Sequence, residues 1–251
     1  MQPDQISVIL LAAGVGRRLQ GLAEGPKVLL RFGGQTLLER HLEALQANGI
    51  GDIALTVGFE ADMIRAELER LGQTSRVRLV ENPDFRQGSL VSLHVQAETM
   101  RSGRSVVLMD GDVLYPHEMI TRLIEAPQEN VLLLDRNLEP GDEPVKICLK
   151  DGKIVDFRKK PVHEHDWHGE SVGFFRFSPA MAAILADVCA EYVRTGRTDQ
   201  EYEEAIRDRI LIEPERFAAT DISDIPWTEI DFSEDVARAK NIILPKLEAV
   251  A

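Results

Sequence analysis

Four glycines and four cations in one short segment could bind the phosphate chain of a ligand. The segment runs from Ala13 to Phe32 and contains a single acid, Glu24. Its cations are Arg17, Arg18, Lys27 and Arg31. This local excess of positive charge stands out because the whole chain has a net charge of -13. Glycines let backbone N–H groups approach a ligand closely, and cations where a strand leads into a loop suit phosphates.

Two common phosphate-binding motifs do not fit this segment. A dinucleotide-binding G-x-G-x-x-G would need glycine at the position of Leu19, and the next strand is expected only near Ile53. The chain also contains no G-x-x-x-x-G-K-[ST]. An ordinary glycine-rich turn is the alternative to a phosphate site.

Acidic side chains also occur in pairs that could face a ligand. Asp110 and Asp112 follow the apolar run 105–109, and carboxylates at i and i+2 of a strand share one face. The glycine between them permits close approach of a ligand at the carboxyl end of a central parallel strand, where α/β proteins bind ligands. A solvated Asp-Gly-Asp turn is the alternative. Glu229 and Asp231 alternate to one side of another predicted strand.

The glycine-rich segment resembles the signature L-A-A-G-x-G-x-R-L…P-K of the NTP-transferase (nucleotidyltransferase) superfamily, which activates sugar phosphates and related phosphate esters. The resemblance implies that Arg18 and the amides around Gly14 and Gly16 bind the β- and γ-phosphates of a nucleoside triphosphate. It also implies that Lys27 stabilises charge that develops at the α-phosphorus. The nucleotide-binding residues implied in this segment are Leu11, Ala12, Ala13, Gly14, Gly16 and Arg17.

The acidic motifs resemble the same superfamily. Residues 227–235 are similar to its ending W-x-E-I-D-[TS]-x-E-D, with Phe232 in place of the usual small hydroxyl residue. The resemblance implies a Mg²⁺ site, because the superfamily uses two aspartates distant in sequence as metal ligands. Of the first acidic pair, Asp110 is favoured and Asp112 is the close alternative. The implied metal-binding residues are Asp110, Asp112, Asp231 and Glu229.

Strands and helices alternate through the first half, which predicts a parallel, doubly wound sheet. The expected strands are 6–10, 53–57, 76–80, 105–109 and 131–134, and the expected helices include 61–71, 180–193 and one that follows Thr36. Ser178 is expected to cap the helix that it precedes, and Ser233 or a neighbour the terminal helix. The resemblance covers essentially the whole chain. It implies an α/β fold, a three-layer α/β/α sandwich with a mostly parallel, Rossmann-like sheet, in one domain over residues 1–251.

The segment 82–93 resembles the N-P-x-[YF]…N-x-x-S-L segment of the phosphocholine-type cytidylyltransferases in this superfamily. This resemblance implies nucleotide contacts from Gln87, Gly88 and Ser89. Family members usually carry asparagine near the position of Arg86 and Gln87. A loop followed by a helix cap is the alternative interpretation.

Residues 145–177 are expected to form a small antiparallel insertion that covers the substrate, with a turn at Asp151-Gly152. Within it, Lys159 and Lys160 offer cations to an acceptor phosphate, and a solvated basic turn is the alternative. The resemblance places Glu170 and Gly173 beside the acceptor.

Residues 199–210 are expected to form an acidic helix on the acceptor side. In the phosphocholine-type enzymes the equivalent helix presents an aromatic residue and acids to the ammonium group of the substrate. The resemblance therefore implies acceptor contacts from Tyr202 and Glu203, a combination that suits an ammonium ion. A solvated acidic helix with Tyr202 packed inward is the alternative.

The tract 163–168 contains three histidines, which would suit zinc if a framework held them. No cysteine or capping structure is expected around the tract, which falls in a predicted loop, so we expect a mobile loop near the acceptor site instead. Cys148 and Cys189 show no metal or redox spacing and are expected to be buried, reduced thiols.

The composition is that of a globular enzyme, with 251 residues, 44% hydrophobic and 28% charged. No apolar run approaches membrane length and the first residues lack the positive flank of a signal peptide, so we expect no membrane span and a cytoplasmic location. The negative net charge argues against nucleic acid as a partner. A homodimer is compatible with the sequence, which does not determine the oligomeric state.

These features predict that a phosphate-bearing acceptor attacks the α-phosphorus of a nucleoside triphosphate and releases pyrophosphate, with Mg²⁺ as cofactor. The expected substrates are CTP and a small phosphate or phosphonate such as phosphocholine, 2-aminoethylphosphonate or inositol-1-phosphate. One alternative is a sugar-1-phosphate nucleotidylyltransferase that uses UTP, GTP or dTTP. Another is a non-catalytic nucleotide-sensing subunit.

Overall fold

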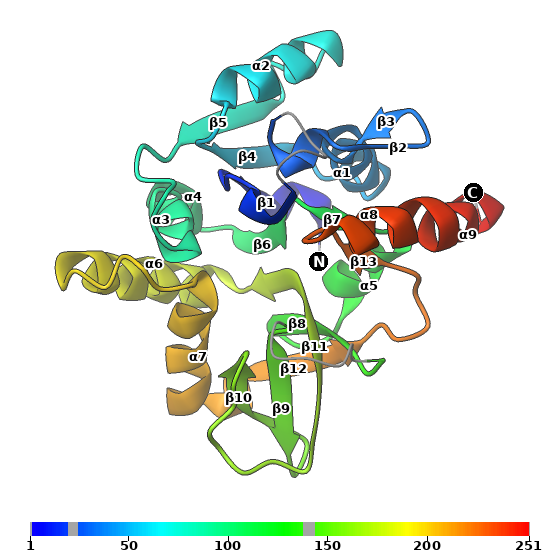
Figure 1. Cartoon of the computed structure of the whole chain (residues 1–251). Helices are drawn as coiled ribbons and strands as arrows, with labels where there is room; N and C mark the ends of the chain where they lie inside the picture. The colour runs from blue at the N-terminus through cyan, green and yellow to red at the C-terminus, as the bar shows by residue number, and fades with distance from the viewer. Residues whose placement is uncertain (1, 20–24, 138–143, 251) are drawn as a thin grey trace.

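Within the described residues, nine strands form one central sheet (Figure 1). The structure is a computed structural model that describes residues 2–19, 25–137 and 144–250. The strands of the sheet are β1 (Ile6–Ala12), β4 (Asp52–Val57), β5 (Val77–Glu81), β6 (Ser105–Asp110), β8 (Asn130–Asp135), β9 (Lys146–Lys150), β10 (Lys153–Arg158), β11 (Trp167–Phe177) and β12 (Phe217–Asp221). Two small ladders lie outside it, β2 (Arg31–Phe32) with β3 (Gln35–Thr36) and β7 (Val113–Leu114) with β13 (Thr228–Glu229).

Helices cover both faces of the sheet. They are α1 (Leu37–Ala47), α2 (Ala61–Arg70), α3 (Ser89–His94), α4 (Ala97–Met100), α5 (Glu118–Glu125), α6 (Pro179–Arg194), α7 (Tyr202–Ile212), α8 (Ser233–Arg238) and α9 (Leu244–Val250). In Figure 1, α3, α6 and α7 lie to the left of the sheet, and α1 and α5 to the right. Alternate residues of β1 point into the two cores, because Val8 and Leu10 pack with α1, α2 and α5 while Ile9 packs with α3, α6 and α7. The predicted three-layer α/β/α sandwich is therefore confirmed.

The first half of the chain forms the parallel part of the sheet, in which β5, β4, β1 and β6 are neighbours in that order. β1 and β6 are almost entirely buried, as expected for parallel strands covered on both faces. The register aligns the carboxyl ends of β1 and β6, since Leu11 pairs with Asp110. The strands predicted here are confirmed, with ends that differ by at most two residues.

The strand β11 joins the parallel part to an antiparallel part. All of its partners in the sheet are antiparallel to it: β8 lies along one edge, and β9 and then β6 lie along the other. β9 and β10 form a hairpin whose turn residues, Asp151 (φ 50°) and Gly152 (φ 75°), both take the positive φ values of a tight two-residue turn. The predicted hairpin is confirmed, and its strands extend the main sheet.

Side-chain caps begin two helices where the sequence predicts them. The Oγ1 of Thr36 accepts a hydrogen bond from the N–H of Glu39 (3.1 Å), and the Oγ of Ser178 accepts one from the N–H of Met181 (3.3 Å). Each bond satisfies a backbone donor in the first helical turn.

Two other helices begin differently from the prediction. α7 starts at Tyr202, three residues late, because residues 198–200 bond to the backbone before α3: the N–H of Gly88 donates to the carbonyl of Thr198 (2.8 Å). At α8, Ser233 is the first helical residue, and the carboxylate of Asp235 accepts from the N–H groups of Asp231 and Phe232 instead.

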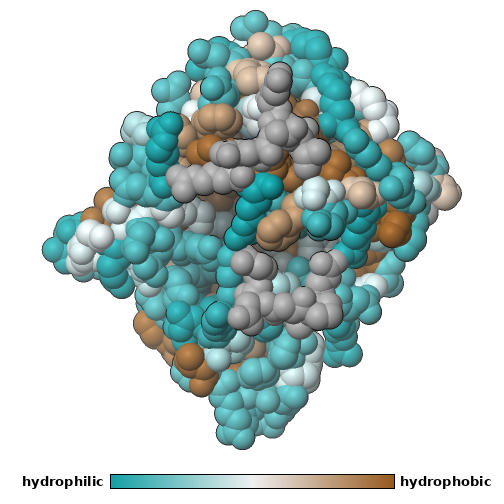
Figure 2. All heavy atoms as spheres, in the orientation of Figure 1, coloured by the Kyte–Doolittle hydropathy of each residue, from teal (hydrophilic) through white to brown (hydrophobic). Residues whose placement is uncertain are grey.

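The surface in the view of Figure 2 is mostly hydrophilic, with small brown groups of exposed apolar residues. Val162 (70% exposed) and Ile212 (64%) are the most exposed large apolar side chains among the described residues. No helix in the described part of the chain is long and apolar enough to cross a membrane.

Candidate active site

A cavity of about 720 Å³ opens at the carboxyl ends of β1 and β6. Its walls come from the loop after β1, the turn after β6, the start of α7 and the segment 227–235. A smaller hollow of about 270 Å³ shares several of these residues and reaches Lys27. Open α/β sheets bind their ligands at this edge of the sheet.

Three carboxylates meet at the cavity. Oxygens of Asp112, Glu229 and Asp231 lie within 4.8 Å of one another. The ladder between β7 and β13 brings them together, because the N–H of Ile230 donates to the carbonyl of Asp112 (2.9 Å). Burial raises the pKa of Glu229 well above its usual value, and the charges of Asp112 and Asp231 raise it further. This all-oxygen set fits Mg²⁺, and a bound cation would relieve the repulsion between the acids.

Lys27 lies between two of these acids. Its Nζ is 2.9 Å from Asp112 Oδ2 and 2.6 Å from Asp231 Oδ1. Burial alone would lower the pKa of Lys27, but the two carboxylates outweigh it and raise the pKa above its ordinary value. Arg18 donates to the other oxygen of Asp231 (2.9 Å) and lies 5.0 Å from the centre of the Phe232 ring. Two of the four cations of the glycine-rich segment, Arg18 and Lys27, thus lie at the carboxylate cluster.

The loop after β1 leaves room for a ligand. A side chain at Gly14 would meet no atom within 4 Å, so the backbone there is open. Gly16 has φ +62°, and an added Cβ would lie 3.1 Å from Cγ of Lys27. The residues of this region that line the cavity or the hollow are Leu11, Ala12, Ala13, Gly14, Val15, Gly16, Arg18, Lys27 and Val28. The side chain of Arg17 lies outside the described part of the chain.

Asp110 has a different partner from Asp112, although both line the cavity. Its Oδ2 accepts a hydrogen bond of 2.6 Å from the hydroxyl of Tyr202. Burial raises the pKa of Asp110 well above its usual value, helped by Asp112 and Glu203. Gly173, with φ +73°, gives this carboxylate its space, since an added Cβ would lie 2.2 Å from Oδ2. Among the described residues, the carboxylate cluster contains Asp112 and not Asp110.

A buried histidine supports the turn between the two aspartates. Nε2 of His41 lies 3.1 Å from the carbonyl of Gly111, and its Nδ1 lies 3.0 Å from the hydroxyl of Tyr115. Burial lowers the pKa of His41 to about 4, so the ring is neutral at pH 7. A carbonyl only accepts, so Nε2 carries the proton and Nδ1 accepts from Tyr115. His41 therefore positions the Asp110–Asp112 turn without binding a ligand.

Three glutamates, Glu170, Glu201 and Glu203, also line the cavity, together with Lys159. Oε2 of Glu203 is buried and has no hydrogen-bond partner within the described residues, and burial, helped by Glu201, raises the pKa of Glu203 to about 8. Burial also raises the pKa of Glu170 to about 7. Lys159 lines the cavity, with its Nζ 3.2 Å from Glu201. Lys160 is exposed and lies outside the cavity lining.

The segment before α3 forms another wall. Phe85, Arg86, Gln87 and Ser89 line the cavity, and the guanidinium of Arg86 lies 4.7 Å from the centre of the Phe85 ring. The Oγ of Ser89 accepts from the N–H of Tyr202 (3.0 Å), so it holds the start of α7. The amide of Gly88 is likewise used within the protein, and Gly88 is outside the lining.

Sequence reasoning missed one pair of lining residues. Asp135, the last residue of β8, accepts a hydrogen bond from Nε1 of Trp227 (2.8 Å). Both line the cavity, together with Asn137. The sequence could have indicated Asp135, because it ends a buried apolar strand in the same way as Asp110 ends β6.

Replacing Gly88 by alanine is expected to lower the thermal unfolding midpoint by about 5 °C or more, because overpacking costs about 1–3 kcal/mol. The new Cβ would lie 2.0 Å from the carbonyl oxygen of Gln200, where backbone has to move. Gly51→Ala is the control, since an added Cβ there meets nothing within 4 Å. Equal midpoints for the two variants would contradict the close packing of this segment.

Comparisons with known proteins identify the family of this chain. Residues 8–154 match the family profile described as MobA-like NTP transferase domain. The bifunctional IPC transferase and DIPP synthase of Rubrobacter xylanophilus is 29% identical over 246 residues, covering 96% of this chain and 52% of that protein. The CMP-5'-(3-aminopropyl)phosphonate synthase of Streptomyces rubellomurinus is 26% identical, covering 94% of this chain and 39% of that protein. The chain thus spans about half the length, or less, of these two relatives.

A solved structure shows the same fold. The inositol-1-phosphate CTP transferase from T. maritima superposes with a TM-score of 0.77 at 20% identity, covering 99% of this chain and 96% of that chain. At this identity the likeness concerns the fold alone. The superfamily resemblance of the glycine-rich segment is confirmed by the family match. Because that match extends over more than half of its residues, the chain belongs to the MobA-like NTP transferase domain family.

Proposed function

We propose that this protein transfers a nucleotidyl group, in the first instance from CTP, to a small phosphate or phosphonate. The observation that carries the proposal is Lys27, held between Asp112 and Asp231 beside the glycine loop. A cation and a carboxylate cluster in one cavity suit a triphosphate and its metal ion. Family membership supports the reaction class. CTP is supported by the names of the phosphonate-acting relative and of the structural neighbour.

In the proposed reaction, an oxygen of the acceptor phosphate forms a bond to the α-phosphorus of the triphosphate. The bond between that phosphorus and the oxygen bridging to the β-phosphate breaks, and pyrophosphate leaves. Lys27 stabilises the charge on the α-phosphate, while Arg18 and the amides of the loop at Gly14 and Gly16 bind the β- and γ-phosphates. A phosphate dianion is already a nucleophile, so no general base is required.

We propose that Asp112 and Asp231 hold Mg²⁺, with Glu229 beside them. The donor set supports this, because three carboxylates with oxygens within 4.8 Å of one another suit a hard cation. When bound, the ion neutralises charge on the phosphates. The sequence favoured Asp110 over Asp112, whereas the geometry favours Asp112, since Asp110 is bonded to Tyr202.

We propose that the acceptor carries an ammonium group, as phosphocholine and aminoalkylphosphonates do. The unpartnered buried oxygen of Glu203 supports this, because a buried carboxylate without a partner is costly unless a cation pairs with it. Tyr202 also lines the cavity, although its ring is packed inward against Phe175, and Lys159 offers a cation to the acceptor phosphate.

The KM for phosphocholine is expected to fall as pH rises through about 8, because Glu203 then becomes charged. Phosphocholine is the suitable probe, since its quaternary ammonium does not titrate. In Glu203→Gln the KM is expected to be about tenfold higher at pH 8.5 and no longer to fall as pH rises through about 8, and the tenfold change corresponds to about 1.4 kcal/mol for a charged contact. Initial rates between pH 6.5 and 9 measure this.

Glu203→Gln is also expected to raise the unfolding midpoint at pH 8.5 but not at pH 5. The folded-state pKa lies above the ordinary value of 4.5. The stability associated with this group is therefore full below pH of about 4.5 and lost as pH rises to about 8. Glu204→Gln is the control for both the KM and the unfolding midpoint, since Glu204 pairs with Arg158 (3.0 Å) and lies outside the cavity lining.

An unchanged KM for phosphocholine in Glu203→Gln would remove the ammonium site from the proposal.

Pyrophosphate release tests the proposed substrates. Each of the four common triphosphates would be combined with Mg²⁺ and, in turn, phosphocholine, 2-aminoethylphosphonate, inositol-1-phosphate or a sugar-1-phosphate. Release with CTP and an aminoalkyl acceptor is the expected result. Release only with a sugar-1-phosphate would replace the acceptor and keep the reaction, whereas no release in any combination would favour a nucleotide-sensing role.

A further inference from the structure

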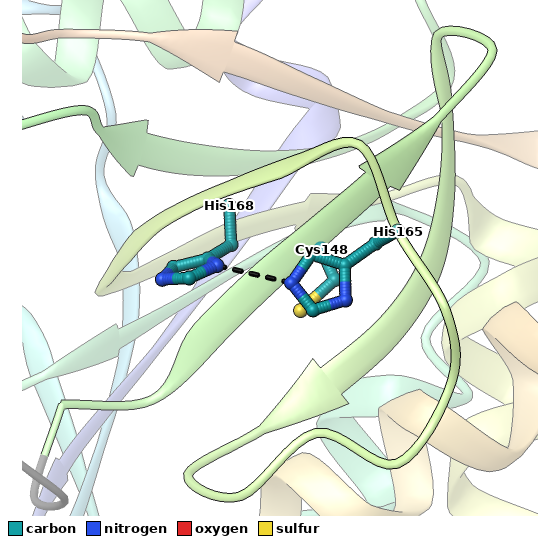
Figure 3. Close-up of side chains that lie close together, drawn as sticks. All are labelled: Cys148, His165 and His168. Carbon is teal, nitrogen blue, oxygen red and sulfur yellow. Dashed lines mark hydrogen bonds between the residues drawn. The ribbon is translucent and has the colours of Figure 1, made fainter.

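One cysteine and two histidines gather at a second place in the molecule, and none of them lines the cavity described above (Figure 3). Cys148 on β9 and His168 on β11 are register partners in an antiparallel pair, so their side chains leave the sheet on the same side. His165, in the loop before β11, completes the group. One ligand atom from each of the three residues lies within 4.8 Å of the other two.

Cys148 points away from the core under α6 and α7. Its neighbours Ile147 and Leu149 both belong to that core, and side chains alternate along a strand. Cys148 is nonetheless fully buried, and His165 lies beside it. His165 belongs to residues 159–166 between β10 and β11, here called the covering segment. The carboxylate of Asp156 holds that covering segment, accepting from the N–H groups of Val162 (2.8 Å) and His163 (3.1 Å). The buried thiol of Cys148 therefore lies between two pieces of backbone that hydrogen bonds hold in place. One is the β9–β11 strand pair, and the other is the covering segment bonded to Asp156.

The hydrogen bonds of the two histidines direct ring nitrogens toward one another. Nδ1 of His165 lies 2.9 Å from the carbonyl of His163, which only accepts, so this nitrogen carries a proton. Its Nε2 therefore has a free lone pair, and it lies 3.0 Å from Nδ1 of His168. Metal-binding histidines commonly have this arrangement, with one nitrogen bonded to a backbone carbonyl and the other directed at the ion.

We propose that Cys148, His165 and His168 form a binding site for a divalent transition-metal ion that prefers thiolate and imidazole ligands, Zn²⁺ above all. The ion would take the place of the proton between the two rings. A tetrahedral zinc ion sets such nitrogen and sulfur atoms about 3.3–3.6 Å apart, so side-chain shifts of about 1 Å suffice. A water molecule would occupy the fourth position.

Binding of the ion releases one proton, that of the Cys148 thiol, as the sulfur–metal bond forms. His168 remains neutral and moves its ring proton from Nδ1 to Nε2. The bonds tie β9, β11 and the covering segment together. We therefore expect the ion to stabilise the fold, independently of the proposed transfer reaction.

Cobalt substitution tests the site with a readout other than activity. The full chain would be stripped of metal with a chelator, placed in excess Mg²⁺ and titrated with Co²⁺. The expected result is a thiolate-to-cobalt charge-transfer band with the visible bands of tetrahedral cobalt, complete at about one ion per chain and abolished by Zn²⁺. Cobalt held by the carboxylate cluster gives no thiolate band.

Variants assign the band to its ligands. Cys148→Ser is expected to lose the band and to bind Zn²⁺ about 100-fold more weakly. The same two effects are expected for His165→Gln. This second variant changes a less buried loop residue, so it serves if Cys148→Ser fails to fold. Cys189→Ser is the matched control, because Cys189 is the other buried free cysteine and lies on α6. Zn²⁺ is expected to raise the unfolding midpoint by about 5 °C in wild type and in Cys189→Ser, but not in Cys148→Ser or His165→Gln. A wild-type protein without the band, or a band that survives in Cys148→Ser, would overturn the proposal.

Discussion

Replacing Lys27 by methionine is expected to lower kcat/KM for nucleotidyl transfer by ~10³-fold or more while leaving the fold intact. Lys27 is largely buried beside the loop that we propose for the phosphates, and Asp112 and Asp231 keep it charged. Methionine matches the lysine side chain in length as far as Cε and lacks the ammonium group. Steady-state rates of pyrophosphate release with CTP and the best acceptor measure the effect.

Lys160→Met is the matched control, because Lys160 is exposed and lies outside the cavity lining. A second readout separates a catalytic role from a structural one. Without Lys27, Asp112 and Asp231 lose the cation between them, so Mg²⁺ is expected to raise the unfolding midpoint of Lys27→Met more than that of wild type. Near-wild-type turnover in Lys27→Met would contradict the account.

Asp112→Asn and Asp231→Asn are each expected to reduce turnover by ~10³-fold and to raise the Mg²⁺ concentration needed for half-maximal rate about tenfold or more. The physical reason is the loss of one negative oxygen ligand from the carboxylate cluster. Rates measured across a Mg²⁺ titration give both quantities. Circular dichroism shows that the variants are folded.

Asp110→Asn provides the discriminating comparison. It is nearly isosteric with Asp110, and its side-chain oxygen can still accept from the hydroxyl of Tyr202. We expect its Mg²⁺ requirement to stay within about threefold of wild type, although its turnover falls. If Asp110→Asn raises the Mg²⁺ requirement and Asp112→Asn does not, the metal ligand is Asp110, which the sequence favoured, and the proposed role of Asp112 is wrong.

The sequence predicted the fold well where local signals and burial agree. Thr36 and Ser178 begin helices as expected, because a hydroxyl that bonds a free N–H needs no distant partner. β1 and β6 were recognisable as apolar runs, since strands covered on both faces must be apolar. Local chemistry was sufficient for these elements.

The choice between Asp110 and Asp112 depended on information outside the local sequence. The i, i+2 rule treats both as strand residues, but β6 ends at Asp110 and Asp112 lies in the turn that follows. The hydrogen bond from the N–H of Ile230 places Asp112 beside Asp231, whereas the carboxylate of Asp110 accepts a hydrogen bond from the hydroxyl of Tyr202. Both partners come from the last fifth of the chain, so neither could be read from the neighbourhood of the motif.

The histidine-rich tract shows the same limit more clearly. The expectation that no cysteine surrounds this tract is wrong, because strand register sets Cys148 directly opposite His168 and close to His165. The start of α7 was also missed, because residues before Tyr202 bond to the segment at Gly88 instead of continuing the helix. Pairings between distant segments decided both features.

The most direct test of the central claim is a phosphorus NMR spectrum of the reaction of CTP with phosphocholine, or with the best acceptor of the panel. Nucleotidyl transfer predicts two coupled resonances of a new diphosphate bridge, one from the α-phosphorus of CTP and one from the acceptor, together with pyrophosphate in equal amount. They are expected with Mg²⁺ and wild-type protein, and absent with Lys27→Met. Formation of CDP and orthophosphate without a new bridge would show simple hydrolysis and contradict the account.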